Sequence, residues 1–331
     1  DEVPVSMSSQ VRILPSALLH RSISRRNRAL NSLSRLNAYS TLPFLSIPMD
    51  EHWVGAPDLS GSTCSEEWVS VSNDVSLRVL HWTPDNKALQ DARPLMMVPG
   101  WGSVFEGWRP LMTEWATRRP IIYVETREKG SARFTKRERV TDFRMEDFIQ
   151  DLVRVMKHFD IEGSCDLFSS SLGSTILIEA MQRGMIDAQS SLFVAPNLDL
   201  KMPFWPRFFI RTPMPKFFLR FTIKMAVWAV QKKVKEEGQR VRYKRTLLSQ
   251  NAGRIRLSAR SLIGYELPDD LSAISIPCGI IAAESDKLHG LENIEKLVKK
   301  IPGAAMIAVP SNQYAHEPDV LVDIDKFYQS L

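Results

Sequence analysis

DLFSSSLGSTILIEA, residues 166–180, passes from a strand-like pattern into a helix-like one within a few residues. Residues 165–168 have the length of a buried strand, and 175–180 form an apolar helical run. Small residues two positions before and after Ser171 permit the tight turn that this change of direction requires. Such a turn presents a hydroxyl at the carboxyl edge of a sheet, beside a helix amino end that favours negative charge. The stretch therefore predicts a nucleophilic serine in a strand-turn-helix unit.

Similar units continue on both sides of this stretch. A hairpin is expected around Asn73-Asp74, a turn-forming pair between two alternating runs. Apolar runs of strand length then alternate with segments of helical periodicity, which indicates strands covered on both faces. The expected strands are 95–98, 121–124, 165–168, 192–195, 279–283 and 305–309, and the expected helices are 105–117, 145–159, one after 172, one around 294 and one after 318. The sequence therefore predicts the α/β class, with a doubly wound, mostly parallel sheet.

The alternation stops at residues 197–268, where helical periodicity and several prolines predict an inserted helical lid. The core is then expected at 66–196 and 269–331. Residues 1–65 form an amino-terminal extension, in which 4–49 contains six arginines and no Asp or Glu. We expect an arm packed on the body, although this composition also resembles a mitochondrial transit peptide, and a leader of cloning origin is a third reading.

Composition sets further limits. No run of about 18 apolar residues predicts a membrane-spanning helix. The three cysteines, an odd number without zinc-like spacing, argue against a disulfide framework and a structural metal. They favour a reducing compartment, so we expect a cytoplasmic protein, with the mitochondrion as the alternative if residues 1–65 contain a targeting segment.

The net charge of +5 is unevenly distributed. Residues 201–260 contain sixteen Lys and Arg against two Glu, which gives this segment +14 and leaves the rest of the chain at −9. Aromatic residues interleave with these cations. We expect them to line an apolar acyl pocket, with lipid-surface contact or recognition of an anionic headgroup as alternatives. A nucleic-acid partner is not expected, and the oligomeric state stays open. The lid residues expected to contact substrate are Phe204, Trp205, Phe208 and Phe209.

A serine hydroxyl needs a general base, and that base needs a third group to fix its tautomer. Among six histidines, His316 lies in the loop after the expected strand 305–309, where open α/β sheets place their sites. We predict His316 as the base, with His289 as the alternative. Asp286, just beyond the expected strand 279–283, is the predicted acid. Two other carboxylates near strand ends remain open, Glu284 and Asp199.

Acyl transfer also needs donors for the oxyanion that develops on the carbonyl oxygen. Two backbone N–H groups suit this role. One belongs to Leu172, directly after the nucleophile. The other belongs to Trp101, in the glycine-containing loop that leaves the expected strand 95–98.

These parts, in this order, resemble the α/β-hydrolase superfamily over residues 67–331. Pro99-Gly100-Trp101-Gly102 is similar to its oxyanion motif, which usually begins His-Gly, and residues 169–173 are similar to Gly-x-Ser-x-Gly, with Ser169 in place of the first glycine. Residues 125–131 stand where the family has Asp-x-Arg-Gly-x-Gly-x-Ser. The resemblance implies a serine esterase or lipase. It disfavours haloalkane dehalogenases and epoxide hydrolases, which use an aspartate nucleophile where this chain has Ser171.

We therefore expect a carboxylic-ester hydrolase that works through an acyl-enzyme, on esters with an apolar acyl chain, without metal or cofactor. Thioesterase or acyltransferase activity would use the same three residues. A catalytically silent protein that binds lipid or a partner through the basic lid is the alternative from another functional class.

Overall fold

The structure is a computed structural model that describes residues 57–200, 210, 216–233, 237–283 and 291–331. The chain divides into two compact units, Asp1–Pro48 and Met49–Leu331. The first unit lies outside the described residues, so the predicted arm has no structural description up to residue 56. The sheet of the second unit begins at Ser62, inside the segment that had been assigned to the extension.

The second unit is built on one mixed sheet, which has nine strands in the described residues. Their spatial order is β1-β2-β4-β3-β6-β7-β8-β9, and β5 pairs with β2. All pairs from β4 to β9 are parallel. The strands are β1 Ser62–Ser72, β2 Val75–Pro84, β3 Leu95–Val98, β4 Ile121–Val124, β5 Arg133–Phe134, β6 Asp166–Ser170, β7 Ser190–Val194, β8 Cys278–Ala283 and β9 Ala305–Val309. The predicted doubly wound, mostly parallel sheet is therefore confirmed.

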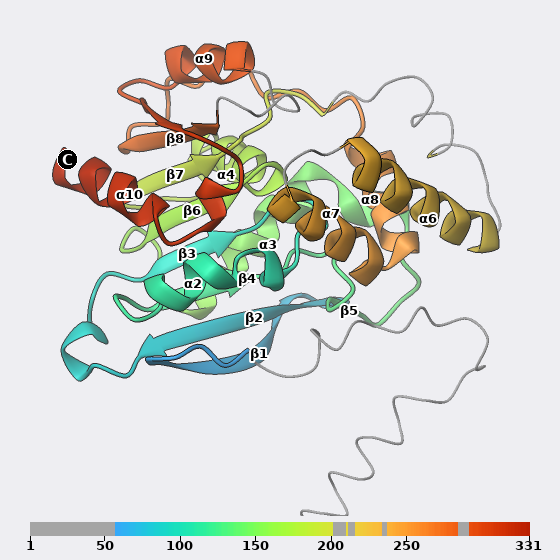
Figure 1. The fold of residues 1–331 in the computed structure, drawn as a ribbon, viewed down its shortest axis with the longest axis horizontal. Helices are drawn as coiled ribbons and strands as arrows, with labels where there is room; N and C mark the ends of the chain where they lie inside the picture. The colour runs from blue at the N-terminus through green and yellow to red at the C-terminus, as the bar shows by residue number, and fades with distance from the viewer. Residues whose placement is uncertain (1–56, 201–209, 211–215, 234–236, 284–290) are drawn as a thin grey trace, which may run out of the picture. The chain divides into compact units, whose positions relative to one another are not determined.

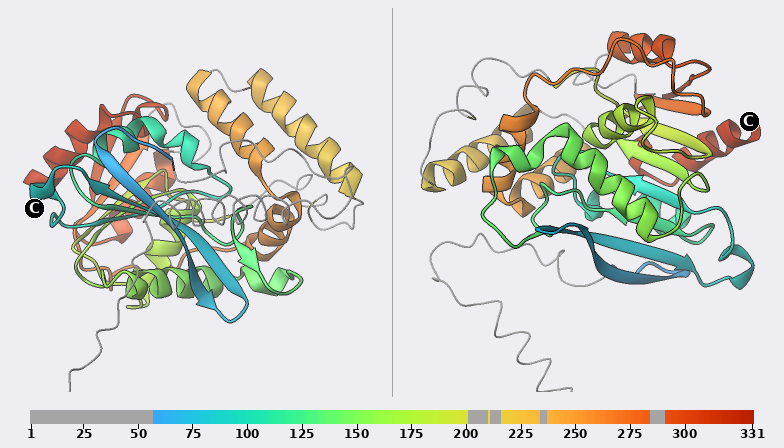
Figure 2. Two further views of the ribbon diagram at one scale, coloured as in Figure 1. Left: turned by 90° about the horizontal axis from the view of Figure 1, so that it is seen from below. Right: turned by 180° about the vertical axis from the view of Figure 1, so that it is seen from behind.

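Helices cover both faces of the sheet because alternate strand residues point to opposite sides. Met96 and Val98 belong to the core under α3, α4 and α9, whereas Leu95 and Met97 belong to the core under α2 and α10. Figure 2 shows α3 and α4 over one face. The helices are α2 Arg109–Trp115, α3 Met145–His158, α4 Leu172–Gln182, α9 Leu291–Lys300 and α10 Val320–Gln329. The apolar runs of β3, β4, β6, β7 and β8 are thus strands buried on both faces, whereas β9 at the edge of the sheet is largely exposed.

The described part of the segment between β7 and β8 contains three helices. It contains α6 Lys216–Lys233, α7 Glu237–Ser249 and α8 Ala252–Leu262, which lie together near the end of the sheet where β3 terminates (Figure 1). Within the described residues, no helix combines the length and apolarity needed to cross a bilayer. Although this segment separates them in sequence, β7 and β8 are direct neighbours in the sheet.

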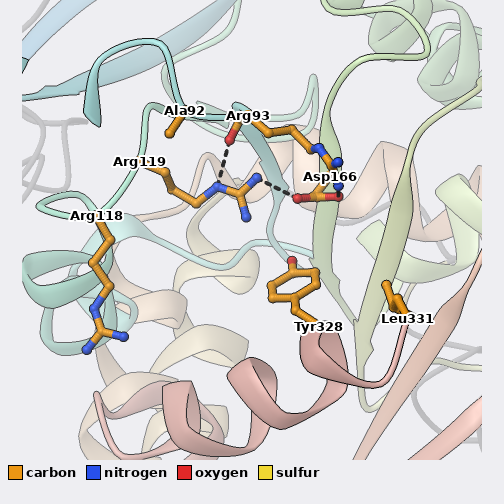
Figure 3. Close-up of a pocket in the computed structure, with 7 residues that line it drawn as sticks. All are labelled: Ala92, Arg93, Arg118, Arg119, Asp166, Tyr328 and Leu331. Carbon is orange, nitrogen blue, oxygen red and sulfur yellow. Dashed lines mark hydrogen bonds and ion pairs between the residues drawn. The ribbon is translucent and has the colours of Figure 1, made fainter. Parts of the chain in front are cut away.

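An ion-pair cluster ties the opposite, amino ends of the parallel strands together (Figure 3). Asp166, the first residue of β6, is buried and accepts from Arg119 Nη2 at 2.5 Å, Arg93 Nη1 at 3.3 Å and Ser190 Oγ at 2.8 Å. These contacts join β6 to β7 and to the segments before β3 and β4. The open cavity of about 480 Å³ beside them is lined by guanidinium groups already engaged with carboxylates, so we assign this cluster a structural role.

Candidate active site

Ser171 occupies a strained backbone position between β6 and α4. Its φ is +46° and its ψ is −115°, values that a residue with a Cβ rarely adopts. The turn is held by the Ser171 N–H, which donates to Val194 O at 2.9 Å, and by close packing two residues later. A Cβ on Gly173 would lie 2.2 Å from Val98 O, so only glycine fits there. The turn predicted from the sequence is therefore present, and it is strained at the residue predicted to be the nucleophile.

The three consecutive serines of the turn have different surroundings. Ser169 is fully buried, and its hydroxyl donates to Ser174 Oγ at 3.0 Å. Ser170 is buried, and its oxygen accepts from the Gly100 N–H at 2.9 Å. Ser171 is half-buried, and its oxygen accepts from Asn197 Nδ2 at 2.9 Å. Because Asn197 supplies the proton in that bond, the hydroxyl proton of Ser171 is left for another acceptor.

His316 lies in a short 3-10 helix after β9, and its ring is held from two directions. Nδ1 is 2.8 Å from the carbonyl oxygen of Asn312. A carbonyl only accepts, so Nδ1 must hold a hydrogen and Nε2 of the neutral ring is the basic nitrogen. The ring also stacks on Trp108, with centroids 3.9 Å apart and planes inclined at 24°. Position and tautomer therefore both suit a general base that acts through Nε2.

One cavity of about 280 Å³ brings three of the predicted residues together. Ser171 and His316 both line it, as does Trp101 from the loop after β3. Much of the remaining wall is apolar, and part of it comes from the carboxyl end of β7 and from α6 and α7. The wall residues from these elements are Val194, Ala195, Val230, Tyr243 and Leu247.

The loop after β3 leaves one of its amides unused. Gly100 N–H donates to Ser170, Gly102 N–H to Glu128 Oε1 at 3.2 Å, and Ser103 N–H to Gly100 O at 3.0 Å. No bond within the described residues takes up the backbone N–H of Trp101, which lies between them. The same holds for Leu172 N–H, at the first position of α4, where helix amides lack intrahelical partners. These are the two donors predicted for the oxyanion.

A buried polar network supports this loop from below. Lys129 and Glu128 are both fully buried, with Nζ and Oε1 3.0 Å apart. Lys129 Nζ also donates to Gly100 O at 3.3 Å and to Thr126 Oγ1 at 2.6 Å, while Thr126 Oγ1 donates to Glu128 Oε1 at 3.0 Å. Since Glu128 Oε1 also accepts from Gly102 N–H, the network holds the loop on both sides of Trp101.

Residues of the helical insertion also contact the oxyanion loop. Gln250 Nε2 donates to Gly102 O at 2.5 Å, and Trp101 Nε1 donates to Ser258 Oγ at 3.0 Å. The φ of Gly102 is +62°, which a glycine adopts without strain. The conformation of the oxyanion loop therefore depends on contacts with both the core and the segment that ends with α8.

Arg127 and Asp151 form a second buried pair in the turn after β4. Arg127 Nε and Nη2 donate to the two oxygens of Asp151 at 2.7 and 2.6 Å. Burial raises the pKa of Asp151 to about 6, although the guanidinium opposes this shift. Because the pair links the turn to α3, it fixes the position of the segment that carries Glu128 and Lys129.

Several predicted residues lie outside the described part of the chain. These are the acid Asp286, its alternative Glu284, the alternative base His289, and the four substrate residues of the lid, Phe204, Trp205, Phe208 and Phe209. Asp199, the other alternative acid, is described. It follows β7 and forms an isolated bridge with Glu266.

The sequence interpretation missed three features of the site. Asn197, which contacts Ser171, follows a buried strand end, and the position alone could have identified it. The charged pair Glu128 and Lys129 also follows such a strand. Asn312 acts through its backbone carbonyl, so its side-chain type carries no information about this contact. Within the described ranges no group of three or more His, Cys, Asp or Glu could hold a metal ion.

Comparison with known proteins shows similarity in structure without similarity in sequence. No family model and no curated protein matches the chain. The enol-lactonase of Burkholderia xenovorans LB400 superposes with a TM-score of 0.64 at 13% identity, covering 80% of this chain and 100% of its own. The esterase EaEST of Exiguobacterium antarcticum gives 0.62 at 14%, with 81% and 100% covered.

An epoxide hydrolase of the α/β-hydrolase superfamily, from metagenomes of hot environments, gives a TM-score of 0.63 at 17% identity, with 80% and 99% covered. These structures belong to enzymes that act on different bonds, so the similarity concerns architecture. The chain has the α/β-hydrolase fold.

Proposed function

We propose that this protein is a serine hydrolase of carboxylic esters. One observation carries the proposal: Ser171 lies in a strained turn at the carboxyl end of β6, in the same cavity as His316 and next to two unused backbone amides. Strain of this kind is typical of residues whose position is required for function. The fold alone would not identify a reaction, since many chemistries share it.

In the proposed reaction, Ser171 Oγ attacks the ester carbonyl carbon while Nε2 of His316 takes the hydroxyl proton. The oxyanion then accepts hydrogen bonds from the N–H groups of Trp101 and Leu172. The tetrahedral intermediate expels the alcohol, to which His316 returns the proton. Water, activated by the same nitrogen, hydrolyses the acyl-enzyme and regenerates Ser171.

Asp286 is the acid in this proposal. The carbonyl oxygen of Asn312 also accepts a hydrogen bond from Nδ1 of His316. The apolar wall suits an acyl group without charge. A volume of about 280 Å³ is at the small end for ligand sites, so we expect short acyl chains to be preferred. Thioesters and acyl acceptors other than water would use the same residues, and competition assays with thiol and alcohol acceptors separate these activities.

Hydrolysis of p-nitrophenyl esters of increasing chain length, by the parent and by Ser171→Ala, tests the proposal. We expect Ser171→Ala to lose at least about 10³-fold in kcat/KM while its thermal unfolding stays cooperative. Ser70→Ala is the matched control, at an exposed serine of β1 that does not line the cavity. A fluorophosphonate probe should label the parent and the control at Ser171, as mapped by mass spectrometry. Equal activity in the parent and Ser171→Ala would favour the catalytically silent alternative.

A further inference from the structure

Among the described side chains of α6, three large apolar ones are exposed along one side. The exposed fractions are 59% for Phe221, 45% for Met225 and 52% for Trp228. Their spacing of four and three residues places them on one face of a helix. We call these three residues the outer face of α6. Large apolar groups gathered in this way mark surfaces that bind a partner or a membrane.

Cations surround the outer face. Helix α6 contains five Lys and Arg and no acid. Lys224, Lys232 and Lys233 are exposed, and Lys232 Nζ lies 4.5 Å from the centroid of the Trp228 ring. The neighbouring α7 adds an exposed Val241 and an exposed Lys244. Exposed apolar and positively charged groups thus occur on both helices.

The opposite side of α6 faces the catalytic cavity. Val230 lines that cavity and lies about 180° around the helix from the outer face, at 3.6 residues per turn. The helix therefore uses one apolar side for the site. Phe221, Met225 and Trp228, on the other side, are about half exposed and belong to neither of the two core clusters.

We propose that the outer face of α6 docks on an anionic phospholipid bilayer. Aromatic and aliphatic groups would enter the boundary between headgroups and acyl chains, while the surrounding lysines pair with lipid phosphates. A second copy of the chain is a poorer occupant because it would bring the same positive charge. Nucleic acid would satisfy the charge and stack on Trp228, but it offers no apolar environment for Met225.

The proposal adds a location to the proposed function and does not depend on it, because vesicle binding is measured without turnover. Docking through α6 would hold the cavity, on the other side of the same helix, close to the membrane surface. Esters that partition into the bilayer would then reach the site without first crossing bulk water.

Sedimentation with sucrose-loaded vesicles tests this inference. The probes are vesicles of phosphatidylcholine alone and of phosphatidylcholine mixed with phosphatidylglycerol, at low and high salt. We expect the full chain to partition at least about tenfold more strongly onto the anionic vesicles, and high salt to weaken this binding. The triple variant Phe221→Ser, Met225→Ser, Trp228→Ser should lose at least about tenfold in partitioning. Lys224→Glu with Lys232→Glu should lose a similar factor.

The matched control is Met306→Ser with Val322→Ser, two apolar side chains on β9 and α10, outside the helical insertion, that are 46% and 58% exposed. It should bind as the parent does, and circular dichroism with thermal melting checks that each variant is folded. The inference would be overturned if the folded triple variant bound anionic vesicles as strongly as the parent does. It would also be overturned if the parent bound neutral and anionic vesicles equally. A dimer that dissociates in the triple variant, or a DNA fragment that displaces the vesicles, would reassign the outer face. A parent protein that does not bind the anionic vesicles but retains Ser171-dependent hydrolysis would reject this inference alone.

Discussion

Asn197 and His316 give the Ser171 hydroxyl complementary surroundings. The oxygen accepts a hydrogen bond from Asn197 Nδ2, and the tautomer fixed by Asn312 leaves Nε2 of His316 ready to accept a proton. A donor on Oγ stabilises any negative charge that this oxygen develops as its proton departs. Asn197 is thus expected to contribute to the reaction, in addition to the three predicted residues.

Replacement of Asn197 tests this contribution. We expect Asn197→Ala to lower kcat about tenfold, corresponding to about 1.4 kcal/mol of lost transition-state stabilisation, with a smaller change in KM. Asn197→Asp has the same shape but offers no donor when ionised, and its carboxylate would compete for the hydroxyl proton, so it should lose more. Steady-state kinetics on a p-nitrophenyl ester provides the measurement. A kcat within about twofold of the parent for both variants would show that the contact is only structural.

At the scale of elements, the oxyanion loop is the part of the site with the most support. Its carbonyls and amides on either side of Trp101 bond to β6, to the turn after β4 and to the insertion. Such donors must be in place before the reaction if they are to stabilise charge without reorganisation. The buried charges at Glu128 and Lys129 are placed to supply that rigidity.

Separating the two buried charges should be costly. Lys129→Met leaves the Glu128 carboxylate buried without its cation, and we expect the free energy of unfolding to fall by about 3–5 kcal/mol in a urea titration. The double variant Glu128→Gln with Lys129→Met should be more stable than Lys129→Met alone, because no unpaired charge remains. Its kcat should still be below that of the parent, because the oxyanion loop loses the hydrogen bond from Lys129 to Gly100 O. Lys299→Met, at an exposed lysine of α9, is the control and should be nearly neutral.

The sequence was most informative about the elements whose residues are buried. The strands at 95–98 and 121–124, which are fully buried, were predicted with the bounds that the structure has, because a continuous apolar run has a sharp beginning and end. The strand at 305–309 was also predicted with its observed bounds, although only Val309 is buried in it. The segment 105–117 was predicted as one helix and is a 3-10 helix followed by α2, with Pro110 in its first turn. Periodicity records which face is buried and does not distinguish such a break.

The site was less predictable because its parts meet through long-range contacts. Local pattern identified the turn at Ser171, and chain order identified His316. The bond from Asn197 to Ser171 and the buried pair below the oxyanion loop depend on which strands become neighbours. Charged residues usually lie at the solvent-exposed surface, so nothing in the local sequence predicted that Lys129 is fully buried.

For the molecule as a whole, the three cysteines report on the integrity of the core. Cys165 and Cys278 are fully buried, on the strand side of the core under α3 and α4, and burial raises the pKa of both thiols to about 12. Cys64 is half-buried, and burial raises its pKa to about 12 as well. All three are therefore protonated at neutral pH and poorly nucleophilic.

A thiol assay follows from these surroundings. With a disulfide reagent at mildly alkaline pH, we expect the native protein to release at most the signal of Cys64, slowly, and all three cysteines to react after denaturation. In Cys64→Ser the native signal should vanish. Rapid reaction of two or more thiols in the native protein would contradict the buried placement of Cys165 and Cys278.

The direct pairing of β7 with β8 has a further consequence for how this chain tolerates change. The two strands meet edge to edge, while the segment that joins them leaves the sheet and returns. Closing such a connection costs free energy that grows only with the logarithm of its length, about 0.6 kcal/mol for each doubling. Insertions and deletions in this connection therefore change the folding free energy of the core little. Changes in length are therefore best tolerated away from Gln250 and Ser258, whose contacts with the oxyanion loop tie the end of this connection to the site.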